Sequence, residues 1–86
     1  MDARAPRTVA AQPHGPAATI TRRAADRLRA GHLWVYRSDV ELLIPPEGST
    51  ALAPGALATV TDSRGIPLGT ALYSDASQIA LRMVSA

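Results

Sequence analysis

Gly31-His32-Leu33-Trp34-Val35-Tyr36 is the stretch around which this chain is organised, because a helix ends and a strand begins there. The pattern of residues 22–30 predicts a helix with alanine and leucine on one side and arginine on the other. Thr21 can cap its N-terminus, and Gly31 suits the left-handed conformation just past its C-terminus. A helix this short is not stable alone, so we expect its apolar side to pack on a sheet.

The residues that follow the helix have the pattern of a β-strand. Residues 34–43 alternate in polarity, which predicts one strand with one buried face. We expect Trp34, the only tryptophan, to be the central core residue, and Tyr36 to share its buried face. Replacing this tryptophan with alanine would then cost about 3 to 5 kcal/mol.

Further short strands are predicted on both sides of this region. They comprise residues 18–21, 56–61, 66–73 and 78–84. The turn Asp62-Ser63-Arg64-Gly65, in which Gly65 supplies a positive φ, makes a hairpin of two of them. Strands this short close most economically into a small barrel or a strongly bent sheet, because closure removes exposed edges. The predicted fold class is therefore mainly β, with one or two short helices.

Length and composition limit the classes of function. We assign residues 19–86 to one small domain and residues 1–18, rich in alanine, proline and arginine and without periodicity, to a disordered leader. The absence of cysteine excludes disulfides and a thiol nucleophile, and two histidines do not make a structural zinc site. No apolar run approaches the roughly 20 residues that cross a bilayer. We therefore expect a cytoplasmic protein without membrane contact.

The net charge of +2 is unevenly distributed along the chain. Residues 1–37 hold seven arginines against two aspartates, a balance of +5. Residues 38–86 hold two arginines against five acidic residues, a balance of −3. All nine basic residues are arginine, whose guanidinium binds phosphate in a bidentate manner. The molecule is therefore expected to be electrically two-sided.

Several short motifs, in order along residues 19–85, resemble those of one protein family. They are Arg29-Ala30-Gly31-His32-Leu33-Trp34-Val35-Tyr36, Pro54-Gly55, Val60-x-Asp62-x-x-Gly65-x-x-Leu68-Gly69, Tyr73-Ser74 and Ser77-Gln78-Ile79-Ala80-Leu81-Arg82. In these motifs the chain resembles the N-terminal PUA domain of the class I SAM-dependent methyltransferases of large-subunit ribosomal RNA. Leu33 departs from the proline that the family usually has. The resemblance implies a PUA-like pseudobarrel that precedes a catalytic domain methylating cytosine at C5.

The resemblance also implies a cofactor and partners that lie outside this chain. The full enzymes use S-adenosylmethionine, received by a glycine-rich turn between a strand and a helix, and a cysteine nucleophile. This chain has no G-x-G-x-x-G sequence and no cysteine. We therefore expect no cofactor and no catalytic residue in this segment. Its expected partners are structured ribosomal RNA and a C-terminal methyltransferase domain, with no binding of DNA.

Six side chains are candidates for RNA contact: Arg22, Arg23, Arg27, Arg29, His32 and Arg37. The arginines of the helix can bind phosphates, or they can form an ordinary solvated face. His32 can touch a phosphate or a base, or it can bond a nearby backbone carbonyl. Trp34, if it is not the core residue, can stack on an unpaired base. Asp62 and Asp75 lie in turns where aspartate bonds backbone amides, so we do not interpret them as a catalytic pair.

Two classes of function remain for the chain. The first is an RNA-binding module that grips phosphates, reads shape more than sequence and positions RNA for a methyltransferase domain. The second is a structural or protein-interaction barrel that packs on a catalytic domain or self-associates without touching RNA. In the second case an exposed apolar patch, and not the arginines, would be the functional surface. An enzyme in its own right is excluded, because the sequence offers no nucleophile, metal set or phosphate loop.

Overall fold

The computed structural model describes residues 15–85 of the chain. Its elements in chain order are β2 (Ala17–Ile20), α1 (Arg22–Arg29), β3 (Trp34–Tyr36), the 3-10 turn η1 (Arg37–Asp39), β4 (Val40–Ile44), β5 (Leu57–Thr61), β6 (Pro67–Tyr73) and β7 (Ile79–Ser85). Most of the predicted leader, residues 1–18, lies outside the described residues, whereas Ala17 and Ala18 belong to β2. The predicted hairpin of residues 56–61 and 66–73 is confirmed as β5 and β6.

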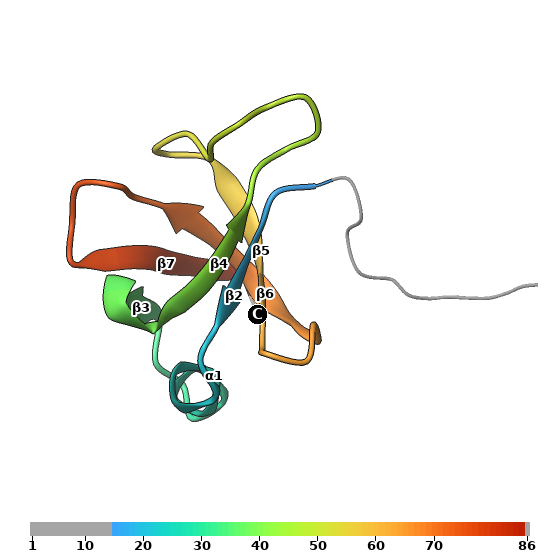
Figure 1. The fold of residues 1–86 in the computed structure, drawn as a ribbon. Coiled ribbons are helices and arrows are strands. Elements are labelled where there is room, and N and C mark those ends of the chain that lie inside the picture. The colour runs from blue at the N-terminus through green and yellow to red at the C-terminus, as the bar shows by residue number, and fades with distance from the viewer. Residues whose placement is uncertain (1–14, 86) are drawn as a thin grey trace, which may run out of the picture.

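The six described strands form one sheet in the order β3-β7-β6-β5-β2-β4. β2 and β5 run parallel, and all other neighbouring pairs in this order are antiparallel. The sheet does not lie flat but curls around (Figure 1), as short twisted strands with bulges do. The prediction of a mainly β fold with a strongly bent sheet and short helices is confirmed.

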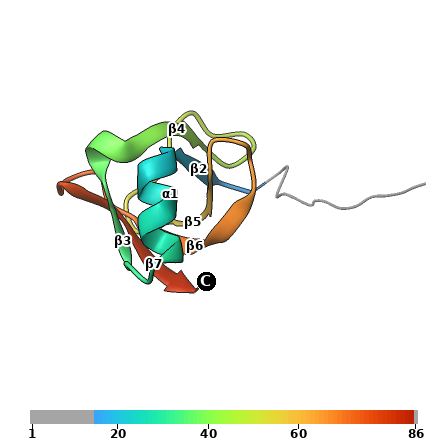
Figure 2. The same ribbon diagram turned by 90° about the horizontal axis from the view of Figure 1, so that it is seen from below.

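Helix α1 lies across one end of the curled sheet, where Figure 2 shows it framed by the strands. Thr21 caps its N-terminus, because its Oγ1 accepts a hydrogen bond from a first-turn amide at 3.2 Å. Past its C-terminus, the amide of Gly31, whose φ is 105°, donates to the carbonyl of Leu28 at 3.0 Å. The amide of His32 donates to the carbonyl of Arg27 at 3.0 Å, which completes a Schellman motif. The predicted roles of Thr21 and Gly31 are thus confirmed, and the helix ends at Arg29, one residue before the predicted end.

The interior of the domain is built mostly from small side chains. Its largest fully buried members are Ile20, Val35, Val60 and Leu81. Between them lie the buried alanines of the core, which are Ala18, Ala24, Ala25, Ala58, Ala71 and Ala80. The aromatic ring of this core comes from Tyr73 of β6, which is 8% exposed.

The prediction that Trp34 is the central core residue is wrong. Trp34 is 43% exposed and Tyr36 is 44% exposed, whereas Val35 between them is 1% exposed. Val35 stands opposite Leu81 of β7, and both point inward. Alternation correctly placed Trp34 and Tyr36 on one face, but alternation does not say which face is buried. The pairing with β7 decides that.

The prediction of one continuous strand over residues 34–43 is also wrong. The η1 turn interrupts it, and the two halves become the opposite edges of the sheet, β3 and β4. Arg37 joins η1 to the β6–β7 turn. Its guanidinium donates hydrogen bonds to the carbonyls of Ser74, at 2.7 Å, and of Ser77 in that turn. A straight strand cannot serve both edges of a curled sheet, so the chain turns where it passes from one edge to the other.

Candidate nucleic-acid interface

The outer side of α1 carries the four helix arginines predicted to contact RNA. Arg22, Arg23 and Arg29 are exposed, and Arg27 is half-buried. The inner side is occupied by alanines that pack on the sheet. Helical periodicity therefore placed the arginines correctly on the solvent side, and their partners decide what each of them can do.

Asp39, buried in η1, holds the first turns of α1. Its carboxylate accepts hydrogen bonds from the hydroxyl of Thr21 at 3.1 Å and from the guanidinium of Arg27 at 3.2 Å. Arg23 lies 3.5 Å from the same carboxylate, with 74% of its side chain exposed. The Thr21 amide also donates to the backbone carbonyl of Asp39 at 2.9 Å. One buried carboxylate thus pairs with two of the predicted arginines, and it holds Arg27 more closely than Arg23.

Asp62, at the start of the β5–β6 turn, is a second buried carboxylate with arginine partners. Its Oδ1 accepts from the amides of Ile66 at 3.0 Å and Arg64 at 2.9 Å, the turn role predicted for it. Its Oδ2 accepts from the guanidinium groups of Arg29 at 2.9 Å and Arg64 at 3.1 Å. The backbone hydrogen bond from Ile66 contributes most to lowering the pKa of Asp62 to about 2, and hydrogen bonds from the Arg64 amide and from the Arg29 and Arg64 side chains add to it. Burial acts in the opposite direction and raises the pKa. Asp62 is therefore ionised at neutral pH and forms ion pairs with both arginines.

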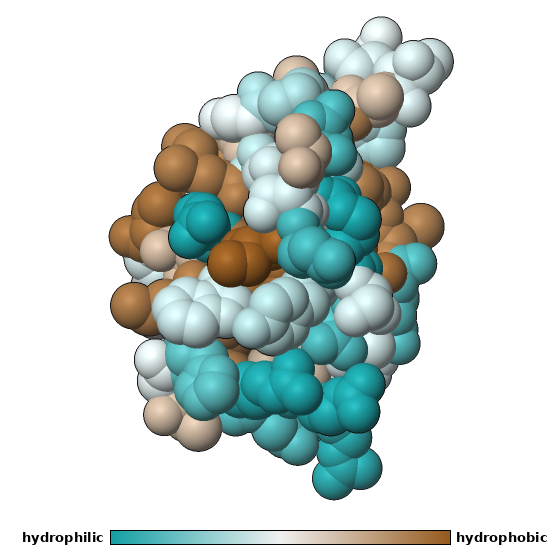
Figure 3. Space-filling view, turned by 90° about the vertical axis from the view of Figure 1, so that its left-hand side faces the viewer, coloured by the Kyte–Doolittle hydropathy of each residue, from teal (hydrophilic) through white to brown (hydrophobic). Residues whose placement is uncertain are grey.

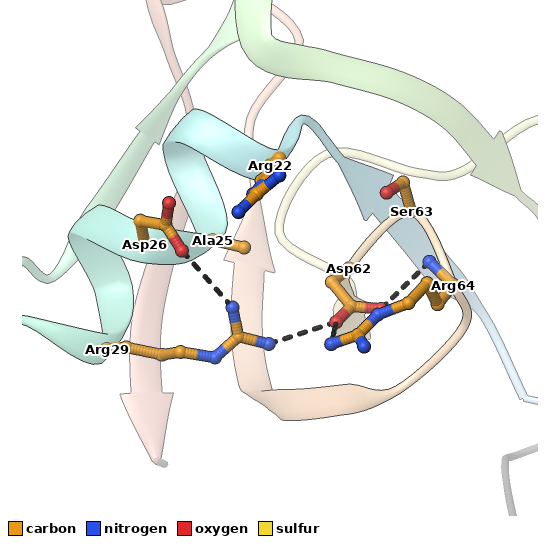
Figure 4. Close-up of a pocket in the computed structure, with 7 residues that line it drawn as sticks. All are labelled: Arg22, Ala25, Asp26, Arg29, Asp62, Ser63 and Arg64. Atoms are coloured by element: carbon orange, nitrogen blue, oxygen red, sulfur yellow. Dashed lines mark hydrogen bonds and ion pairs between the residues drawn. The ribbon is translucent and has the colours of Figure 1, made fainter.

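A cleft of about 430 Å³ lies between α1 and the β5–β6 turn. Figure 4 shows Arg29 between the carboxylates of Asp26 and Asp62, with Arg64 on the other side of Asp62. The residues lining the cleft are Arg22, Ala25, Asp26, Arg29, Asp62, Ser63 and Arg64. Three arginines against two aspartates leave the cleft with a net charge of +1. A hollow with guanidinium groups on both walls and a serine hydroxyl suits an anion such as a phosphate.

Arg22 differs from the other arginines of the cleft in having no partner. Of the seven arginines within residues 15–85, only Arg22 and Arg82 make neither an ion pair nor a hydrogen bond through their side chains. Arg22 also lines a shallow groove on the outer side of α1, together with Arg23, Arg27 and His32. The full charge of Arg22 is therefore available to a ligand at the junction of the cleft and the groove.

Arg37 lies apart from the other candidates. Its guanidinium donates to the carbonyls of the β6–β7 turn, with Nε 3.0 Å from the Ser77 oxygen. It borders a different groove, lined mainly by β4. Asp75, in the same turn, is exposed, and the turn amides bond the hydroxyls of Ser74 and Ser77 instead. The structure thus brings together five of the six predicted side chains and not the sixth.

The comparison with protein families agrees with this architecture. Residues 18–86 match the model of a family described as PUA-like domain. The chain belongs to the PUA-like domain family. No curated protein matches it.

In this PUA-like domain the cleft also contains two residues that local sequence patterns do not identify as part of a site. Ser63 and Arg64 come from the β5–β6 turn, more than 30 positions beyond α1. The turn signal around Asp62 was recognised, but nothing in the local sequence shows that the turn faces the helix. The docking of α1 across the end of the sheet brings the two segments together (Figure 4).

The surface of the PUA-like domain is uneven in hydropathy. Figure 3 shows hydrophilic side chains gathered at the lower end, where α1 lies, and apolar side chains along one side. Within residues 15–85, histidine and acidic side chains form no group of three that could hold a metal ion. No helix in this described part is long and apolar enough to span a bilayer.

Proposed function

We propose that this PUA-like domain binds RNA, and that the cleft between α1 and the β5–β6 turn receives a backbone phosphate. The observation that carries the proposal is the meeting of Arg22, Arg29 and Arg64 around one cleft from two distant parts of the chain. Guanidinium groups bind phosphate oxygens through paired, charge-assisted hydrogen bonds. Phosphate contacts of this kind position a protein on RNA without reading its sequence.

The two buried carboxylates, Asp39 and Asp62, orient arginine side chains around the cleft and the groove. Asp62 holds Arg29 and Asp39 holds Arg27, so two partly buried guanidinium groups are oriented before a ligand arrives. Arg23 and Arg64 make exposed ion pairs with the same two carboxylates. Ordering a long side chain on binding costs about 0.5 to 1.5 kcal/mol, a cost that is reduced when the side chain is already held. The unpaired Arg22 then supplies charge that no carboxylate offsets. The arrangement favours a rigid, structured RNA whose phosphates match these positions.

We further propose the biological setting from the resemblance of the sequence motifs. In that setting the domain grips structured ribosomal RNA and orients it for a C-terminal methyltransferase domain of a cytoplasmic enzyme. The methyltransferase domain would bind S-adenosylmethionine and carry out the methyl transfer. The strand-to-helix junction described here, at Thr21, contains no glycine and has its hydroxyl bonded to Asp39, so it does not fit that cofactor.

The test is a fluorescence anisotropy titration of the domain onto a structured ribosomal RNA fragment at several salt concentrations. The variant is Arg22→Gln, which removes one positive charge without breaking an ion pair of the described residues. Its matched control is Thr50→Glu, which lowers the net charge equally from an exposed position in the loop after β4. We expect Arg22→Gln to weaken binding several-fold and to reduce the slope of log affinity against log salt by about 1. If both variants bind as the unaltered domain does, the cleft is not the RNA site.

A further inference from the structure

The outer face of the sheet carries a row of side chains across four strands. The register places Leu57 of β5 opposite Leu72 of β6, Leu72 opposite Arg82 of β7, and Arg82 opposite Trp34 of β3. Directly opposite residues of antiparallel strands point to the same side of the sheet. Leu57, Leu72 and Trp34 are 54%, 40% and 43% exposed, and Arg82 is exposed as well.

We propose that Trp34 and Arg82 form a stacking site for an unpaired RNA base. The inference rests on the proposed function and names the kind of RNA that the domain prefers. This is a structured RNA whose double-helical stem faces α1 and has an unpaired nucleotide beside it. A tryptophan ring held on a strand offers a flat face on which any base can stack. The adjacent guanidinium can bond the phosphate of the same nucleotide or stack on its base.

The state of Arg82 is the first reason for this inference. It is one of the two arginines without a partner among the described residues, and the other is Arg22 in the cleft. An arginine kept beside an exposed indole with no carboxylate near it in the row is complementary to a polyanion. The two unpartnered arginines of the described domain would then both serve one ligand.

The position of Trp34 is the second reason. It lies two residues after His32, which lines the shallow groove with Arg22, Arg23 and Arg27. Two residues of extended chain span at most about 7 Å. The stacking site therefore borders the shallow groove on the outer side of α1. One RNA strand that leaves the cleft can reach it.

A second copy of the chain fits this face less well. In a two-fold contact centred on the row, each partner presents the same residues to the other. Arg82 would then be buried close to its own copy, and the row has no acidic residue to neutralise the pair. Burying unpaired like charges is strongly unfavourable. An anionic single strand meets no such penalty.

The experiment uses the fluorescence of Trp34, the only tryptophan of the chain. The domain is titrated with two ribosomal RNA hairpins of equal length, one fully paired and one with unpaired nucleotides beside the stem. We expect the second hairpin to quench the fluorescence and to bind more tightly. In anisotropy titrations Trp34→Ala should lose about tenfold in affinity for that hairpin, since each lost stack contributes about that much. Trp34→Phe should retain most of the affinity, and Leu57→Ala, at the far end of the row, should change it little.

The outcomes separate this inference from the proposed function. If Arg22→Gln weakens binding while both hairpins leave the fluorescence unchanged and Trp34→Ala and Arg82→Gln bind normally, the stacking site is wrong and the phosphate cleft stands. If neither hairpin binds, both proposals are wrong. If the tryptophan emission shifts with protein concentration alone and sedimentation shows a dimer, the face is a contact between copies, and the inference is overturned. Arg82→Gln, on the surface, and Trp34→Phe keep the test valid should Trp34→Ala fail to fold.

Discussion

Replacing Asp39 with alanine removes the carboxylate that joins α1 to the turn connecting the two edges of the sheet. Three contacts are lost. The hydrogen bond from the Thr21 hydroxyl, at 3.1 Å, reaches a side chain that is 5% exposed, and a bond to a charged group contributes about 1.5 to 3 kcal/mol. The ion pairs to Arg27 and Arg23 involve side chains that are 38% and 74% exposed, so each contributes about 1 kcal/mol or less.

The total expected loss is therefore about 2 to 4 kcal/mol of the free energy of unfolding, against about 5 to 15 kcal/mol for a small domain. Urea unfolding followed by far-UV circular dichroism measures this loss. The midpoint of Asp39→Ala should fall by about 1 to 3 M, with an unchanged dependence on urea concentration. Arg27→Ala should cost about 1 kcal/mol or less, and Arg23→Ala close to nothing.

The order of these three variants is the decisive result. If Asp39→Ala unfolds at the same urea concentration as the unaltered domain, the carboxylate does not hold the helix to the turn. If Arg23→Ala costs as much as Asp39→Ala, the exposed ion pair, and not the buried hydrogen bond, is the source of the stability. Either result would refute the argument from burial.

Three further predictions concern single residues. Leu81→Ala should lower the free energy of unfolding by roughly 2 to 5 kcal/mol in urea titrations, because Leu81 is fully buried. Trp34→Ala, at a half-exposed position, should lower it by only about 1 to 2 kcal/mol. Equal losses for the two variants would contradict the assigned core. Gly31→Ala should lower the free energy of unfolding by about 1 to 2 kcal/mol in the same titration. The added Cβ meets no atom within 4 Å, so this cost comes from the backbone conformation alone, with φ at 105°. Gly31→Asn should show a smaller loss in thermal unfolding. The pKa of Asp62 is lowered from 3.8 to about 2, so its contribution to stability is complete above about pH 4 and is lost as the pH falls towards 2. Urea unfolding midpoints measured across this pH range should therefore fall more steeply for the unaltered domain than for Asp62→Asn. Parallel curves for the two proteins would exclude the effect.

The features that were predictable depend on a few neighbouring residues. The cap at Thr21, the left-handed Gly31 and the β5–β6 turn with Gly65 at a φ of 87° each follow from local chemistry, and each is confirmed. The same holds for the hydrogen bonds between Asp62 and nearby amides. These interactions span at most five residues, so the sequence contains all that is needed to recognise them.

The features that were not predictable depend on segments far apart in the chain. The burial of Val35 instead of Trp34 follows from its pairing with Leu81 of β7. The break after Tyr36 follows from the curl of the sheet, which sends β3 and β4 to opposite edges. Alternation of polarity is the same in either case. It could therefore identify a two-faced strand but neither its end nor its inner face.

The candidate site divides in the same way. The sequence by itself determined that a helix with arginines on its outer side lies beside the only tryptophan, because helical periodicity and capping act within one segment. Only the tertiary structure decided that Arg29 and Arg64 meet at Asp62, and that Arg22 remains unpaired beside them. Ion pairs between segments form only after the sheet has curled and α1 has docked across its end. The distances that select them do not exist in the unfolded chain, which is why the sequence alone did not reveal the cleft.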